Sequence, residues 1–179
     1  GIPGSVGGAL VMNAGAYGSE IKNILKSARV MTNEGEVLEL SVDELELGYR
    51  TSCIPDRGYT VLEASFHLEP GERAAIEARM KELAARRREK QPLEYPSAGS
   101  TFKRPQGYFA GKLIEDAGLR GYGMGGARVS EKHCGFVING GNATASDVMA
   151  LCGHIRKTVL EQSGVELEME VKRWGNFDL

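Results

Sequence analysis

The sequence predicts an α+β fold, in which helices and antiparallel strands follow one another without a regular βαβ order. Two short apolar runs flank a turn sequence near the beginning and predict a β-hairpin. Two longer stretches, 72–90 and 146–162, carry apolar residues at helical spacing. A hydrophobic fraction of 41% in 179 residues is enough for one good core or two small ones.

Residues 1–70 are expected to hold mainly strands. Ser5 is a candidate cap for a short helix after the glycine-rich start. Val42–Leu47 is expected to form a short helical turn. Strands are expected at Ser27–Thr32, Val37–Leu40 and Thr60–Leu68. The turn sequence of residues 33–36 separates the first two strands and predicts their hairpin.

A helix is expected at Glu72–Lys90, where cations in the last turns suit the helix dipole and Pro92 ends the pattern. Its expected apolar stripe consists of Ile76, Met80, Leu83 and Ala84. Pro70-Gly71, just before this helix, is the expected domain boundary. We therefore expect one domain at residues 1–70 and a second at residues 71–179.

The second domain is expected to mix helices and strands. Helices are expected at Ala110–Ala117 and Ser146–Gln162, ended by Gly118 and Gly164. The expected apolar stripe of the longer helix consists of Val148, Leu151, Cys152, Ile155 and Val159. Strands are expected at Ala127–Val129, Gly135–Ile138 and Val165–Trp174. The last of them alternates strictly, with Glu166, Glu168 and Glu170 on its polar face.

Composition excludes several classes of protein. A net charge of −2 and a pI near 6.0 argue against a general nucleic-acid binder. No apolar run reaches the ~18 residues of a membrane span, so we expect no membrane insertion. The three histidines lack metal-ligand spacing, and no metal site is expected. The three cysteines are expected to be reduced, buried thiols of a cytosolic protein: Cys53, Cys134 and Cys152.

The chain opens on a glycine-rich segment, residues 1–8, in which four glycines let the backbone approach a ligand closely. A helix N-terminus just after them would offer N–H groups to an anion such as a phosphate. The spacing fits neither a dinucleotide fingerprint nor a P-loop, so a tight structural turn is an equally good interpretation. Because such a loop usually follows an element that positions it, we expect that upstream sequence is missing.

Three further stretches carry candidate chemistry, each with a plainer interpretation. Ser100, followed by cations, could donate a proton in a dry site, or it could simply cap a turn. Arg50 could form a guanidinium fork for a carboxylate or enolate, although a surface arginine is the more common case. By periodicity alone, Glu170 is a solvated carboxylate like its two neighbours.

Taken in order, five motifs resemble the UDP-N-acetylenolpyruvoylglucosamine reductase family from end to end. They are GIPGSVGGALVMNAGAYG, GYRTS, YPSAGSTFKRP, AGKLIEDAGLRGYGMGGARVSEKHCGFVIN and EVKRWG. The short interval between Arg50 and Ser100 resembles the second type of the family, which lacks an extra substrate-covering loop. The resemblance implies that residues 1–70 are the second FAD-contacting domain, a partial FAD module without its upstream N-terminal part. Residues 71–179 would be the smaller C-terminal substrate-binding domain.

The resemblance also implies the chemistry. NADPH reduces FAD, and UDP-N-acetylglucosamine enolpyruvate is then reduced to UDP-N-acetylmuramate, a peptidoglycan precursor, in the bacterial cytoplasm. Arg50 and Glu170 would stabilise enolate charge, the latter in its protonated form, and Ser100 would be the proton donor. Tyr17, Lys90 and Lys103 would contact substrate or stabilise the serine alkoxide. The flavin would lie against Gly1, Ile2, Pro3, Gly4, Ser5, Gly7, Gly8 and Ala9.

Two alternatives remain open at this stage. The first is an FAD-dependent oxidase of the same superfamily that passes electrons to oxygen, although the AGSTFKRP and EVKRWG motifs speak against it. The second is a catalytically silent fragment that only binds nucleotide sugar, because much of the FAD-binding surface would be missing.

Overall fold

The structure is a computed structural model that describes residue 2 and residues 4–175. It divides into two compact units, residues 1–81 and residues 82–179, and each is described by itself. With 33% of residues helical and 21% in strands, the fold is α+β, as predicted.

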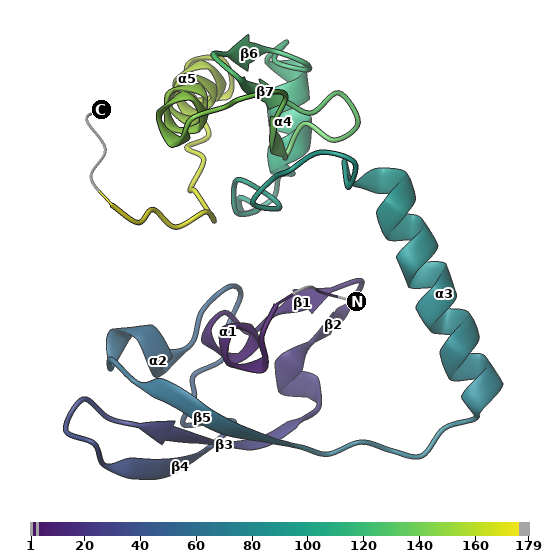
Figure 1. Ribbon diagram of the computed structural model, residues 1–179, viewed down its shortest axis with the longest axis vertical. Coiled ribbons are helices and arrows are strands. Elements are labelled where there is room, and N and C mark those ends of the chain that lie inside the picture. Colours follow the sequence, from purple (N-terminus) through teal and green to yellow (C-terminus); the bar gives the residue numbers. More distant parts are fainter. Residues whose placement is uncertain (1, 3, 176–179) are drawn as a thin grey trace. The chain divides into compact units, whose positions relative to one another are not determined.

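A three-stranded antiparallel sheet forms the base of the first unit (Figure 1), with the strand order β4-β3-β5. Its strands are β3 (Leu25–Met31), β4 (Val37–Ser41) and β5 (Thr60–Phe66). The predicted hairpin is confirmed, because β3 and β4 pair antiparallel around the expected turn. The buried core of this unit consists of Leu10, Leu25, Ala28, Val30, Leu40, Leu45 and Ile54.

Short elements complete the first unit. They are α1 (Val6–Val11), β1 (Gly15–Ala16), β2 (Ser19–Glu20), the 3₁₀ helix η1 (Ile21–Asn23) and α2 (Cys53–Asp56). The predicted cap is confirmed, because the Ser5 hydroxyl accepts a hydrogen bond from the Gly8 amide at 3.1 Å. The helical turn expected at Val42–Leu47 is instead a run of hydrogen-bonded turns, which buries Leu45 completely.

Helix α3 (Arg73–Lys90) is confirmed as predicted, but its expected apolar stripe is not a core face. None of its residues is buried, and the side chains of Ile76 and Met80 are 49% and 65% exposed. The helix crosses the division between the two units, so neither core covers this stripe. Ion pairs one turn apart, such as Arg73–Glu77 at 2.8 Å, support the exposed helix.

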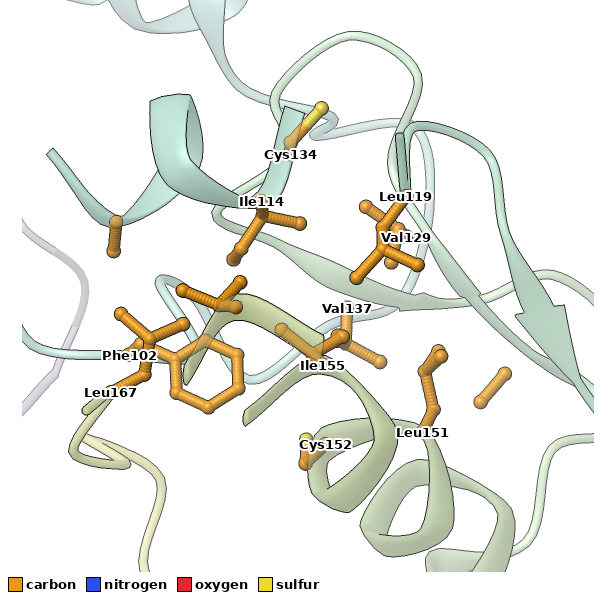
Figure 2. Packing of buried hydrophobic residues seen from close by; sticks show 13 residues of the cluster. Phe102, Ile114, Leu119, Val129, Cys134, Val137, Leu151, Cys152, Ile155 and Leu167 are labelled. Atoms are coloured by element: carbon orange, nitrogen blue, oxygen red, sulfur yellow. The ribbon is translucent and has the colours of Figure 1, made fainter. Parts of the chain in front are cut away.

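The second unit packs two helices with a small antiparallel sheet of order β6-β7-β8 (Figure 1). Its elements are α4 (Ala110–Asp116), β6 (Gly123–Met124), β7 (Ala127–Val129), β8 (Val137–Asn139) and α5 (Ala145–Ser163). Figure 2 shows Leu151, Cys152 and Ile155 of α5 among the buried residues of this core. A capping box of Thr144 and Asp147 starts α5, and Gly164 ends it at a φ of 71°.

The strand predicted at Val165–Trp174 is wrong as a regular strand. Its alternation does describe burial, since Leu167 is fully buried between the exposed Glu166 and Glu168. The segment forms only one isolated bridge, between Met169 and Phe102. The segment with which it pairs, Thr101 to Lys103, is too short for a longer ladder. Residues 165–174 therefore form an extended tail with a few main-chain hydrogen bonds.

All three cysteines are buried and free, as predicted. Among the described residues, none of the helices combines the length and apolar composition that crossing a bilayer requires.

Candidate functional site

The glycine-rich segment forms an exposed edge of the first unit. Ile2, Gly4, Ser5 and Gly8 are exposed, and Gly7 and Ala9 are half-buried. Gly1 and Pro3, also predicted to contact flavin, lie outside the described residues. Gly4 has a φ of 141°, which strongly favours glycine there, and a Cβ on Gly7 would lie 3.7 Å from Val61 Cβ of β5. The segment therefore offers a largely exposed backbone.

Tyr17 lies at the tip of the β1–β2 hairpin. Tyr17 and Gly18 both have positive φ, 54° and 81°, as in the tightest two-residue hairpin turns. A Cβ on Gly15 would lie 2.8 Å from the carbonyl oxygen of Ser19, so only glycine fits where the two strands meet. The turn leaves the Tyr17 side chain 44% exposed and available to a ligand.

Arg50 lies in a second tight turn, which Gly48 and Thr51 close by pairing across it. Arg50 itself has a φ of 56°, and its guanidinium Nη1 donates to the carbonyl oxygen of Gly15 at 3.4 Å. The guanidinium carbon also lies 5.2 Å from the centre of the Tyr49 ring. The structure thus brings the arginine turn to the base of the hairpin that carries Tyr17.

Asn13 holds this arrangement together, and sequence reasoning missed it. Only 1% of the residue is exposed. Its Nδ2 donates to Glu20 Oε2 at 3.0 Å and to the Gly48 carbonyl oxygen at 3.1 Å, while its Oδ1 accepts from the Lys22 amide at 3.1 Å. One side chain therefore connects the end of α1, the hairpin and the arginine turn.

Glu20 adds a negative charge beside this network. Hydrogen bonds from the side chains of Lys22 and Asn13 hold the pKa of the Glu20 carboxyl below its usual value, and the charge of Arg50 acts in the same direction. The base of the hairpin therefore carries an anion close to the Arg50 guanidinium.

Ser100 and Glu170 lie on neighbouring segments of the second unit. Ser100 is exposed and follows Gly99, whose φ is 85°. The Glu170 amide donates to the Thr101 carbonyl oxygen at 2.9 Å, and Glu170 is half-buried. Two residues that are far apart in sequence are thus linked through Thr101.

Lys103 lies on the same pair of segments, whereas Lys90 does not. The Lys103 amide donates to the Glu168 carbonyl oxygen at 2.8 Å, and its ammonium Nζ lies 2.5 Å from Glu168 Oε1. Lys90 is the exposed last residue of α3. Arg50 and Tyr17 belong to the other unit, so the structure groups the predicted residues into two separate sets.

An open groove also runs along the C-terminal segment. Its lining consists of Arg156, Glu166, Glu168, Met169, Val171, Lys172 and Arg173. Neither Ser100 nor Glu170 belongs to this lining, and its Arg156 and Glu166 pair with each other at 3.0 Å. We therefore place the candidate chemistry on the joined segments rather than in this groove.

Comparisons with known proteins point to one family. A family model described as "UDP-N-acetylenolpyruvoylglucosamine reductase, C-terminal domain" matches residues 91–174, and one described as "FAD binding domain" matches residues 1–41. A UDP-N-acetylenolpyruvoylglucosamine reductase of Agathobacter rectalis is 63% identical over 177 residues, which are 99% of this chain and 56% of the relative. One of Lachnoclostridium phytofermentans is 62% identical over 98% of this chain and 56% of its own length.

A solved structure agrees with these relatives. The crystal structure of the UDP-N-acetylenolpyruvylglucosamine reductase from Thermus caldophilus matches with a TM-score of 0.82 at 36% identity. The match covers 95% of this chain and 61% of that one. The chain therefore spans a little over half the length of the curated relatives it matches, 56% for the two named here.

Proposed function

Because the chain belongs to the UDP-N-acetylenolpyruvoylglucosamine reductase family, we propose that the protein carrying it makes UDP-N-acetylmuramate. The substrate would be UDP-N-acetylglucosamine enolpyruvate, with NADPH as the electron source and FAD as the cofactor. The reaction would supply peptidoglycan precursor in the bacterial cytoplasm. The observation that carries the proposal is the hydrogen bond from the Glu170 amide to the Thr101 carbonyl oxygen, because it sets the proposed acid next to the segment of the proposed proton donor.

The residues of the first unit fit one wall of a flavin site. The FAD-binding match covers residues 1–41, and within it the backbone at Gly4 and Gly8 is exposed. The Ser5 hydroxyl accepts from the Gly8 amide and still has its O–H group to donate, so both this side chain and the glycine backbone would contact the cofactor. When bound, FAD supplies the hydride. Residues 1–70 would thus contact the flavin and, through Tyr17 and Arg50, the substrate, whereas residues 71–179 would bind the substrate.

The proposed roles of the catalytic side chains follow from charge. Addition of a hydride to C3 of the enolpyruvyl group leaves negative charge that spreads from C2 onto the carboxylate. The Arg50 guanidinium would offer two parallel N–H groups to that carboxylate. Glu170, in its protonated form, would donate a hydrogen bond to the enolate oxygen. Ser100 would then deliver the proton to C2.

Substrate binding would use cations and an exposed ring. Tyr17 and Lys90, both exposed, would contact the nucleotide diphosphate. Lys103, whose ammonium is fixed by Glu168, would stabilise the Ser100 alkoxide from its place three residues further along the chain. This support is needed because a free serine hydroxyl is a weak acid.

An anaerobic experiment tests the proposal. It follows the visible flavin absorbance of a complete enzyme, made by joining this chain to the part of the Agathobacter rectalis relative that it does not cover. We expect NADPH to bleach the band and the enolpyruvyl sugar nucleotide to restore it. Recovery only when oxygen enters would support the oxidase alternative and contradict the roles of Ser100 and Glu170.

A matched variant tests the proton donor separately. Replacement Ser100→Ala should leave reduction of the flavin by NADPH unchanged and slow its reoxidation by substrate by about 10²-fold or more, as loss of a general acid does. Equal slowing of both half-reactions would contradict the proposed role.

One observation favours a second candidate function for the chain by itself. Because the chain spans 56% of its relatives' length, it could bind the nucleotide sugar without catalysing its reduction. Calorimetric titration of the separate chain with the enolpyruvyl sugar nucleotide tests this. Binding without flavin would support it, and the absence of binding would contradict it.

A further inference from the structure

Thr101 is buried between the two segments that carry the proposed catalytic groups. Only 3% of the residue is exposed. Its amide donates to the Gly135 carbonyl oxygen at 2.9 Å, and its Oγ1 accepts from the Val137 amide, also at 2.9 Å. Its carbonyl oxygen accepts from the Glu170 amide at 2.9 Å. Amide, carbonyl and side chain therefore each hold a different hydrogen bond.

The three hydrogen bonds connect Thr101 to two different parts of the second unit. Two of them join Thr101 to the backbone of Gly135, in the loop before β8, and to the backbone of Val137, the first residue of β8. The third joins Thr101 to the C-terminal segment at Glu170. Since the peptide bond to Thr101 is planar, the position of Ser100 follows from the same anchorage.

We propose that Thr101 is a positioning residue, whose buried hydroxyl fixes the relative placement of Ser100 and Glu170. The inference deepens the proposed function and rests on it. The hydroxyl bond to Val137 is the side-chain part of the anchorage, so replacing this side chain removes one bond and leaves the two main-chain bonds possible.

A threonine suits this position for two reasons. Its branched Cβ favours the extended backbone that pairs with the C-terminal segment. Its hydroxyl accepts from the amide of the buried Val137, as buried donors require. Serine would keep the second property, alanine would keep neither, and valine would keep the first property alone.

The plainer interpretation is that Thr101 only stabilises the core. Its neighbour Phe102 is 4% exposed and belongs to the buried cluster of this unit (Figure 2), so a general loss of packing is a real competitor. The two interpretations differ in what they predict for separate half-reactions. A packing defect lowers stability and the amount of active enzyme, whereas misplacement of Ser100 slows only the step in which the substrate receives its proton.

The experiment compares four variants of the complete, FAD-loaded enzyme described above. They are Thr101→Val, Thr101→Ala, Thr101→Ser and Ser100→Ala. Stopped-flow absorbance records flavin reduction by NADPH and flavin reoxidation by substrate separately. A misplacement of about 1 Å can cost ~10²-fold in rate, so we expect Thr101→Val to slow reoxidation about tenfold and reduction by less than about twofold.

The serine and alanine variants isolate the hydroxyl, and they serve even if the valine variant fails to fold. Both lose the methyl group, but only serine keeps the acceptor for Val137. We expect Thr101→Ser to reoxidise about tenfold faster than Thr101→Ala. Equal rates for these two variants would overturn the inference, and so would equal slowing of both half-reactions.

A double variant separates positioning of Ser100 from other effects. If Thr101 acts through Ser100, its replacement should slow reoxidation much less in the Ser100→Ala background than in the parent. Full additivity would overturn the positioning role. A parent enzyme that is bleached by NADPH but not restored by substrate would instead overturn the proposed function itself, so the two failures are distinguishable.

Discussion

Replacement of Asn13 by alanine should destabilise the first unit strongly, although the residue touches none of the proposed reacting atoms. Its side chain is buried and its φ is 44°, a region that alanine occupies at a cost. Two of its bonds involve main-chain groups, the Gly48 carbonyl oxygen at 3.1 Å and the Lys22 amide at 3.1 Å. Both groups would lose their partner in the alanine variant.

The magnitude follows from these terms. Loss of the two hydrogen bonds to main-chain groups, at about 1 kcal/mol each, contributes about 2 kcal/mol. The third partner, Glu20, keeps its ion pair with Lys22 at 3.0 Å and is left out of the sum. The left-handed backbone adds up to about 1 kcal/mol, because alanine lacks the polar side chain with which asparagine offsets the cost of this region. We therefore expect the free energy of unfolding to fall by about 3 kcal/mol in Asn13→Ala. The matched control Asn13→Gly loses the same hydrogen bonds but tolerates the backbone, and should fall by less.

Urea unfolding, followed by circular dichroism on the complete enzyme and its two variants, measures the difference. The result also bears on Arg50, because Asn13 binds the turn that carries it. We expect the flavin-bound variant to show weaker substrate binding than the parent. A loss below about 1 kcal/mol, or a glycine variant less stable than the alanine variant, would refute the reasoning.

Three other predictions concern the second unit and the separate chain. Gly153 of α5 faces open space, so Gly153→Ala should raise the free energy of unfolding by about 0.5–1 kcal/mol. Gly126→Ala should lower it by about 2 kcal/mol, because the new Cβ would lie 2.4 Å from the Ala143 amide nitrogen. Thermal unfolding of the two variants measures the difference. Hydrogen bonds from the backbone and side chain of Thr144 hold the pKa of the Asp147 carboxyl below its usual value. The stability that this carboxylate contributes is therefore present above that usual value and is lost as pH falls through the lowered pKa. Unfolding measured at several pH values should therefore show that the loss of unfolding free energy caused by Asp147→Asn becomes smaller as the pH falls. A loss that does not change with pH would contradict this prediction. The separate chain should purify colourless, and an absorbance spectrum with stoichiometric FAD would contradict that expectation.

Local patterns predicted the elements whose boundaries depend on local chemistry. The Ser5 cap, the β3–β4 hairpin and α5 follow from capping residues, turn residues and helical spacing, and all three are confirmed. Four of the five residues expected on the apolar stripe of α5 are buried, while Val148 is only half-buried. Such signals act over a few residues, so a single sequence contains them.

The wrong predictions concern elements whose burial or pairing depends on segments far away in the sequence. The apolar stripe of α3 identifies a face but does not reveal whether anything covers it, and Leu83 is only half-buried. The tail after α5 alternates as a strand does, but the segment from Thr101 to Lys103 is its only recorded main-chain partner among the described residues. Pairing between segments so far apart in the sequence leaves no periodic pattern by which it could be predicted.

Two structurally central residues were missed for different reasons. Asn13 had a weak signal, because it is a polar residue directly after an apolar run and asparagine tolerates a positive φ. Thr101 had none, because a threonine between a serine and a phenylalanine reads equally well as a turn or a strand. The roles proposed for both depend on long-range hydrogen bonds that only the folded chain displays.

The three glutamates of the tail show how structure separates residues that periodicity treats alike. Glu166 pairs with Arg156 at 3.0 Å, and Glu168 pairs with Lys103 at 2.5 Å; their side chains are 73% and 70% exposed. Glu170 is half-buried, and its amide is bonded to the residue that follows Ser100. Of the three, Glu170 is therefore the one whose backbone is joined to the segment of the proposed proton donor, in agreement with the role that the family resemblance implies.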